Sequence, residues 1–196
     1  MKYLVMILLL VSCMNTEKND AVVTPKKEYS FKWNKPDLTK ILVREIKNSG
    51  LDKLLPKDAK EFGYKSGMDM VEFWGNILVQ MMKYESSWKP ETTYLEAFKD
   101  SKGKRVLSSG LFQISVESAN NTKRGNCKAK QSDLIKADFN IWCSLRILKA
   151  LIIERDINRL AGRGMVNGKI DWYGGARYWS VLRTPSKLAS IKAAND

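Results

Sequence analysis

The sequence predicts a mainly α-helical domain with one small β-hairpin, an α+β fold. Apolar residues recur at helical spacing along most of the chain, and this period is lost between residues 92 and 107. Apolar residues make up 44% of the 196 residues, which is enough for a packed core. The length fits one domain of ordinary size with a short N-terminal extension.

The first two predicted helices have clear boundary signals. One runs over residues 37–49, with Asp37 as its candidate N-cap, and ends before Gly50. The next opens at Asp69, with Glu72 three positions later in a capping-box pattern. Both segments carry apolar residues at spacings of three and four, so each presents one face to a core.

The segment over residues 92–107 favours a hairpin. Two short apolar stretches flank the turn sequence Lys99-Asp100-Ser101-Lys102-Gly103. Helical patterning then returns, and we expect helices over residues 110–120, 133–155 (the longest) and 171–182. A short last helix is expected after Pro185.

The N-terminus predicts export with a lipid anchor. The apolar run over residues 3–11 is shorter than the about 20 residues of a membrane span, and it fits a secretory signal peptide. The stretch Leu10-Val11-Ser12-Cys13 resembles the lipobox of bacterial lipoproteins. In that class the signal is cut before the cysteine, whose thiol carries a diacylglycerol. An ordinary signal peptide with a chance cysteine is the alternative.

These observations divide the chain into three parts. Residues 1–12 are assigned to a lipoprotein signal peptide, residues 13–35 to a polar tether without a sustained period, and residues 36–196 to the folded domain. Because Met14 rather than Asp follows the cysteine, we expect a lipid-anchored protein of the outer membrane, facing the periplasm. Without the lipobox, the protein would be secreted.

Two cysteines remain once Cys13 carries lipid. Cys127 and Cys143 are then an even pair in an exported and oxidising compartment, which predicts a disulfide between them. Two buried free thiols are the alternative.

The composition excludes several kinds of chemistry. The chain has no histidine, which removes Ser-His-Asp and Cys-His nucleophile pairs and histidine metal sites. Three cysteines cannot build a four-cysteine zinc site, and we expect neither a metal nor a cofactor. The proton chemistry of an enzyme would therefore rest on Glu, Asp, Lys or Tyr.

The charge balance is strongly basic. Lys plus Arg number 34 against 21 Asp plus Glu, a formal net charge of +13. An exported basic protein would meet anionic lipid headgroups or the carboxylates of cell-wall peptides, and the charge also fits a solvated surface with no partner. Nucleic acid is not expected as a partner, because the chain has an export signal and no concentrated arginine-rich stretch.

Three segments, in order along the chain, resemble motifs of a known family. They are Tyr84-Glu85-Ser86-Ser87-Trp88, Ser108-Ser109-Gly110-Leu111-Phe112-Gln113-Ile114, and Asp138-Phe139-Asn140-Ile141-Trp142-Cys143-Ser144-Leu145-Arg146-Ile147-Leu148. They are similar to the E-S-x-aromatic, S-x-G-L-M-Q-I and D-x-x-x-N-I-x-x-G-x-x-x-L blocks of lytic transglycosylases of the soluble (SLT) type. That family has the lysozyme-like fold and is close to goose-type lysozymes. Trp172-Tyr173-Gly174-Gly175-Ala176 resembles its A-Y-N-A-G block more loosely.

The resemblance implies a set of site residues. Glu85 matches the catalytic acid of the family. Ser109 and Gln113 match positions whose polar groups line the sugar groove, and Tyr173 would bring a phenol near the Glu and the bound sugar. A surface amide for Gln113 and plain packing for Tyr173 are the alternatives.

The neighbours of Glu85 point to the same role. Met81, Met82, Tyr84 and Trp88 would desolvate its carboxyl and favour the protonated form, as a general acid for glycoside cleavage requires. A solvated glutamate at the end of a helix is the alternative.

The resemblance implies cleavage of the β-1,4 bond between N-acetylmuramic acid and N-acetylglucosamine in peptidoglycan. A lytic transglycosylase would use Glu85 as acid and then as base while the muramyl 6-hydroxyl closes an anhydro ring. A hydrolytic lysozyme with a second carboxylate is the runner-up, and Glu91, Glu96 and Asp100 lie in the hairpin region without fitting a motif. A catalytically silent, wall-binding lipoprotein is the third reading, and the oligomeric state is open.

Overall fold

The computed structural model describes residues 27–196, and it has the predicted mixed α+β architecture. The signal peptide, Cys13 and the first part of the tether lie outside the described residues. The α-helices and strands follow in the order α1 (Pro36–Ser49), α2 (Met70–Ser86), β1 (Thr93–Lys99), β2 (Arg105–Ser109), α3 (Val116–Ala119), α4 (Ala137–Ile153), β3 (Ala161–Val166), β4 (Lys169–Gly174) and α5 (Pro185–Lys192).

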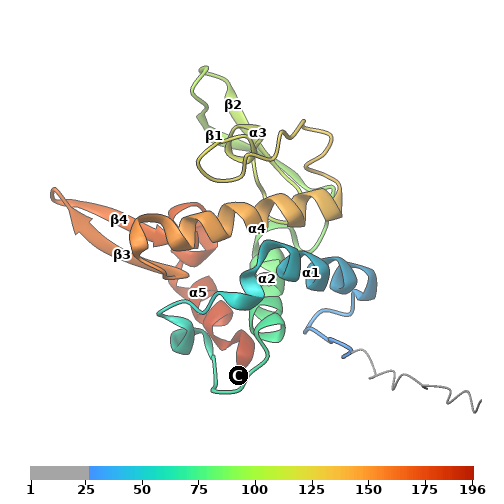
Figure 1. Ribbon diagram of the computed structural model, residues 1–196. Coiled ribbons are helices and arrows are strands. Elements are labelled where there is room, and N and C mark those ends of the chain that lie inside the picture. The colour runs from blue at the N-terminus through green and yellow to red at the C-terminus, as the bar shows by residue number, and fades with distance from the viewer. Residues whose placement is uncertain (1–26) are drawn as a thin grey trace, which may run out of the picture.

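Helix α2 is the centre of the core. It buries apolar side chains around most of its circumference, among them Phe73, Trp74, Ile77 and Met81. Helix α1 packs against both α2 and α4, and α5 packs against α2 (Figure 1). The C-terminal end of α2 therefore emerges from a packed helical body, beside the β1–β2 hairpin.

The predicted start of α2 is confirmed, and that of α1 is corrected by one residue. The Asp69 carboxylate accepts hydrogen bonds from the amides of Val71 (2.9 Å) and Glu72 (3.1 Å). Helix α1 has Lys35 rather than Asp37 as its N-cap. Pro36 takes the first helical position, where its lack of an amide hydrogen costs no hydrogen bond.

Two predicted helices are shorter than the sequence suggests. Within residues 110–120 only α3 is helical, because Ser109 and Ile114 form an isolated β-bridge and Gly110 has a φ of 81°. The segment over residues 133–155 forms a turn before α4 begins at Ala137. The predicted β1–β2 hairpin is present, with Thr93 opposite Ser109.

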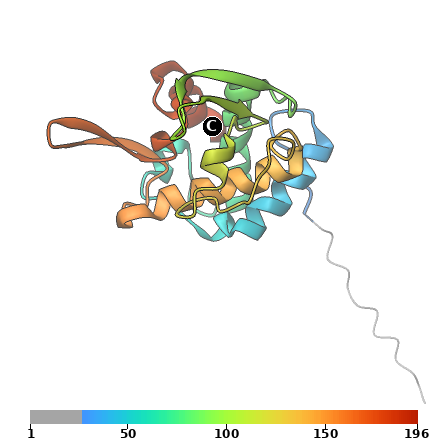
Figure 2. The same ribbon diagram turned by 90° about the horizontal axis from the view of Figure 1, so that it is seen from above.

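The helix predicted over residues 171–182 is wrong. Residues 169–174 form β4, which pairs with β3 in continuous antiparallel register around Asn167 and Gly168. Asn-Gly with positive φ at both positions (50° and 73°) is the sequence that a two-residue hairpin turn requires. Figures 1 and 2 show this second hairpin projecting away from the helical body.

The folded part begins before residue 36. Phe31 and Trp33, which fall in the segment assigned to the tether, are buried. Phe31 packs against Gly75 of α2, where a Cβ atom would lie 2.2 Å from its ring. The Trp33 indole donates to Thr39 Oγ1 at 2.8 Å and fixes the segment to α1.

The predicted disulfide is present. Cys127 and Cys143 are joined with an Sγ–Sγ distance of 2.10 Å, which ties the loop after α3 to helix α4. None of the described helices is both long and apolar enough to cross a membrane.

Candidate active site

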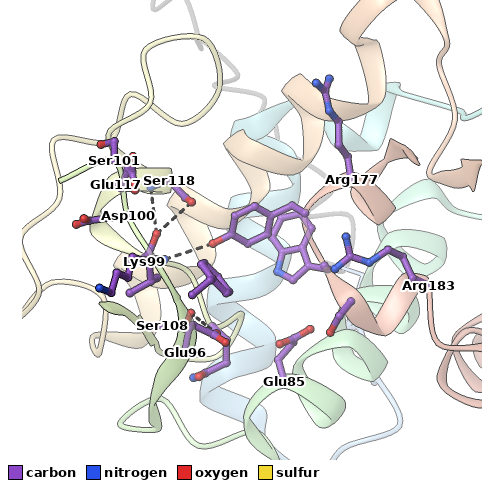
Figure 3. A pocket seen from close by; sticks show the side chains of 17 residues that line it. Glu85, Glu96, Lys99, Asp100, Ser101, Ser108, Glu117, Ser118, Arg177 and Arg183 are labelled. Carbon is purple, nitrogen blue, oxygen red and sulfur yellow. Dashed lines mark hydrogen bonds between the residues drawn. The ribbon is translucent and has the colours of Figure 1, made fainter. Parts of the chain in front are cut away.

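A cleft of about 470 Å³ lies between the β1–β2 hairpin, the end of α2 and the short helical turns over residues 175–183 (Figure 3). The residues that line it and matter most for its chemistry are Glu85, Glu96, Ser108, Gln113, Tyr178 and Arg183. Several of them are far apart in sequence and are brought together by the fold.

Glu85 occupies the last turn of α2 at the wall of this cleft. Its Oε1 atom is buried without a hydrogen-bond partner. Burial raises the pKa of the Glu85 carboxyl to about 7, while Lys187 lowers it, the charge of Glu96 raises it and Arg183 lowers it. The carboxyl therefore holds its proton up to neutral pH, as the sequence context of Glu85 predicts.

The chain turns sharply after Glu85. Ser87 and Trp88 both adopt left-handed backbone conformations, with φ of 52° and 61°. Such values are strained for a bulky residue, and surrounding contacts hold them. The Trp88 indole donates to the Val79 carbonyl at 2.8 Å, and Ser86 Oγ donates to the Leu111 carbonyl at 3.0 Å. These bonds end α2 directly behind the acid.

Glu96 of β1 faces the same space as Glu85. Its Oε1 atom accepts a hydrogen bond from Ser108 Oγ at 2.7 Å across the hairpin (Figure 3). The sequence alone predicts no role for Glu96. Spacing along the chain carries no signal for it, because the register of β1 with β2 is irregular between Leu95 and Lys99 and the hairpin itself brings Glu96 into the cleft.

Gln113 lines the cleft, but its amide nitrogen is already engaged. Nε2 donates to the carbonyls of Thr92 (2.9 Å) and Gly110 (2.8 Å). Ser109 is fully buried behind the cleft, and its hydroxyl accepts a hydrogen bond from Gln131 Nε2 at 2.6 Å. The adjacent residue of the strand, Ser108, faces the cleft instead.

A buried amide on α4 organises this segment. Asn140 Oδ1 accepts a hydrogen bond from the Phe112 amide at 2.9 Å. Its Nδ2 donates to the carbonyls of Ser109 (3.0 Å) and Leu134 (2.9 Å). Gly110 is needed here, because a Cβ atom would lie 2.2 Å from Asn140 Nδ2.

Tyr173 lies on β4, where its ring covers Gly164 of β3, and it does not line the cleft. The phenol in the cleft is that of Tyr178, whose oxygen accepts a hydrogen bond from the Ser115 amide at 3.3 Å. Burial raises the Tyr178 pKa, so this group stays neutral. In the described part of the chain, no group of three or more Cys, Asp or Glu side chains is arranged to hold a metal ion.

No family model and no curated protein matches the chain. A solved structure of the Bdellovibrio protein Bd0314 DslA, its wild-type form 2, matches with 33% identity and a TM-score of 0.68, over 83% of this chain and 90% of that chain. The chain belongs to the same family as Bd0314 DslA.

Two further structures of Bd0314 DslA also match this chain at 33% identity and a TM-score of 0.68. The match to the first covers 80% of this chain and 86% of the Bd0314 DslA chain, and the match to the second covers 83% of this chain and 90% of the Bd0314 DslA chain. Each is a single Glu-to-Gln variant, and the two substituted positions lie 11 residues apart in that protein. Gln keeps the size of Glu but cannot ionise, so these variants point to an enzyme that works through glutamate.

Because its pKa is raised, Glu85 lowers the free energy of unfolding at neutral and alkaline pH. Its carboxyl binds a proton in the folded chain between about pH 4.5 and 7, where the unfolded chain has released it. Wild-type stability therefore falls as pH rises through this window. We expect Glu85→Gln to be as stable as the wild type at pH 4 and roughly 2–3 kcal/mol more stable at pH 8. Urea unfolding at both pH values measures this difference, and a difference that does not vary with pH would contradict it.

Proposed function

We propose that this protein is a glycosidase that cleaves the β-1,4 bond between N-acetylmuramic acid and N-acetylglucosamine in peptidoglycan. The observation that carries the proposal is the carboxyl of the half-buried Glu85, which lines a cleft, has a buried Oε1 atom without a partner and has a pKa of about 7. Breaking a glycosidic bond requires a proton on the leaving oxygen, and a carboxylic acid with a raised pKa supplies it near neutral pH. The three sequence blocks supply the substrate class.

Glu96 favours hydrolysis over ring closure. It lines the same cleft, and its charge acts on Glu85. Glu85 and Glu96 are 11 residues apart, the same separation as the two substituted glutamates of Bd0314 DslA. A second carboxylate near the acid is what a glycoside hydrolase needs and what a lytic transglycosylase with one Glu does without.

In this mechanism the two carboxyls act on one bond in the same step. Glu85 donates its proton to the glycosidic oxygen as the bond to the sugar breaks. The Glu96 carboxylate, oriented by Ser108, accepts a proton from the water that attacks the sugar carbon. The product carries a reducing end. Gln113 is a candidate sugar contact, while the packing of Ser109 and Tyr173 favours supporting roles for them.

Two substitutions in this chain, Glu85→Gln and Glu96→Gln, and the chemical ends of the released fragments test this proposal. Glu85→Gln should lower cleavage of purified peptidoglycan by roughly 10²–10⁴-fold, because it cannot deliver a proton. Glu96→Gln should cause a loss of similar size, whereas Glu91→Gln, an exposed residue outside the cleft, should not. Mass spectrometry of the released fragments should show reducing ends.

Two results would count against this account in different ways. Fragments ending in 1,6-anhydromuramic acid, with Glu96→Gln still active, would identify a lytic transglycosylase, which the sequence resemblance favours. Full activity of Glu85→Gln would defeat the assignment of the acid altogether.

We also propose that a lipid on Cys13 holds the enzyme at the outer membrane, facing the peptidoglycan. The support is the lipobox-like stretch before Cys13 and the residue Met14 after it. Glycan strands and the membrane are then its partners, and nucleic acid is not.

The anchoring proposal has a direct test in cell fractionation. Cys13→Ser should move the protein from the membrane fraction to a soluble fraction, because a single residue carries the acyl chains. A Cys13→Ser protein that still fractionates with membranes would rule out the lipobox interpretation.

A further inference from the structure

The two faces of the β3–β4 hairpin have different compositions. Residues directly opposite each other in an antiparallel pair share a face, and the register pairs Arg163 with Trp172 and Met165 with Ile170. These four residues define the Trp172 face. The opposite face carries Tyr173, whose ring covers Gly164.

The Trp172 face is an exposed apolar strip with a cation at its side. Met165 is 66% exposed and Ile170 is 53% exposed, on a hairpin that projects from the body (Figure 2). Arg163 is exposed opposite Trp172, which is partly buried against the core. Apolar side chains this exposed on a projecting hairpin suit a contact surface.

The Trp172 face is continuous with the cleft. The Arg183 guanidinium lies 5.9 Å from the centre of the Trp172 ring, and Arg183 also lines the cleft and acts on the Glu85 carboxyl. The opposite face makes other contacts: Asp171 accepts a hydrogen bond from Arg155 at 2.8 Å, beyond the end of α4. A chain leaving the cleft past Arg183 would therefore reach Trp172, and then Ile170 and Met165.

We infer that the Trp172 face extends the substrate site and holds the glycan strand where it leaves the cleft. This inference rests on the proposed glycosidase function. Aromatic and aliphatic side chains pack against the apolar faces of pyranose rings, and Trp172 and Ile170 supply both. Arg163 supplies a cation for the carboxylates of the attached peptides. The hairpin would thus select long strands over short fragments.

A binding experiment tests the surface without requiring cleavage. In the Glu85→Gln background, the double substitution Met165→Ser and Ile170→Ser should weaken pelleting with insoluble peptidoglycan about tenfold. Both side chains are exposed, so the fold should be unaffected. The matched control is Val166→Ser, which changes a residue that is 50% exposed on the opposite face and should leave binding unchanged.

An activity measurement then separates strand binding from chemistry. With Glu85 intact, the double substitution should lower kcat/KM on polymeric glycan about tenfold, and leave it unchanged on an oligomer short enough to occupy only the cleft. Equal loss on both substrates, no loss on either, or equal loss from Val166→Ser would overturn the inference. A change in oligomeric state of the double variant would instead identify the face as a contact between two copies, and would also overturn it. A wild type that binds but releases no fragments would refute the glycosidase, while the pelleting result would still decide the role of the hairpin.

Discussion

The cleft depends on one fully buried amide, that of Asn140. Its side chain joins α4 to the backbone at Ser109 and Phe112, about 30 residues earlier in the chain, and to the Leu134 carbonyl in the turn before α4. Each of these backbone groups would cost about 1–3 kcal/mol if left buried without a partner. The same side chain requires Gly110, which has no Cβ to overlap it. The backbone next to the cleft at residues 109–112 is therefore held by Asn140, a residue that does not line the cleft.

Hydrogen bonds from the residues that follow Glu85 hold its backbone in place while its carboxyl stays poorly solvated. Ser86 bonds to the Leu111 carbonyl and Trp88 to the Val79 carbonyl, so the chain on either side of the acid is held while Oε1 has no partner. Burial away from water disfavours the charged carboxylate, so Glu85 keeps its proton up to a pH of about 7. The carboxyl of Glu96 has a different environment from that of Glu85, because its Oε1 atom accepts a hydrogen bond from the Ser108 hydroxyl. Two glutamates in one cleft thus have two environments, as the roles of acid and base require.

The sequence predicted the helical body well, because caps such as Asp69 and strong apolar periods act locally. Glu85 was predicted from the resemblance of Tyr84-Glu85-Ser86-Ser87-Trp88 to a family block, and its apolar neighbours pointed to the same role. The sequence missed β4, since the apolar residues of a short strand also fit a helical period, and the strand is defined by its pairing with β3 around the Asn167-Gly168 turn. It gave Glu96 no role because pairing across a hairpin, not spacing along the chain, brings it into the cleft. Tyr173 matched a motif, but in the cleft its expected place is taken by Tyr178.

The pKa that the fold gives the Glu85 carboxyl can be measured without any substrate. Carboxyl carbon resonances of protein labelled with ¹³C-glutamate can be followed as a function of pH, with Glu85→Gln identifying the signal of Glu85. We expect a titration midpoint of about 7 for that signal. A midpoint near 4.5, the ordinary value for a glutamate, would contradict it.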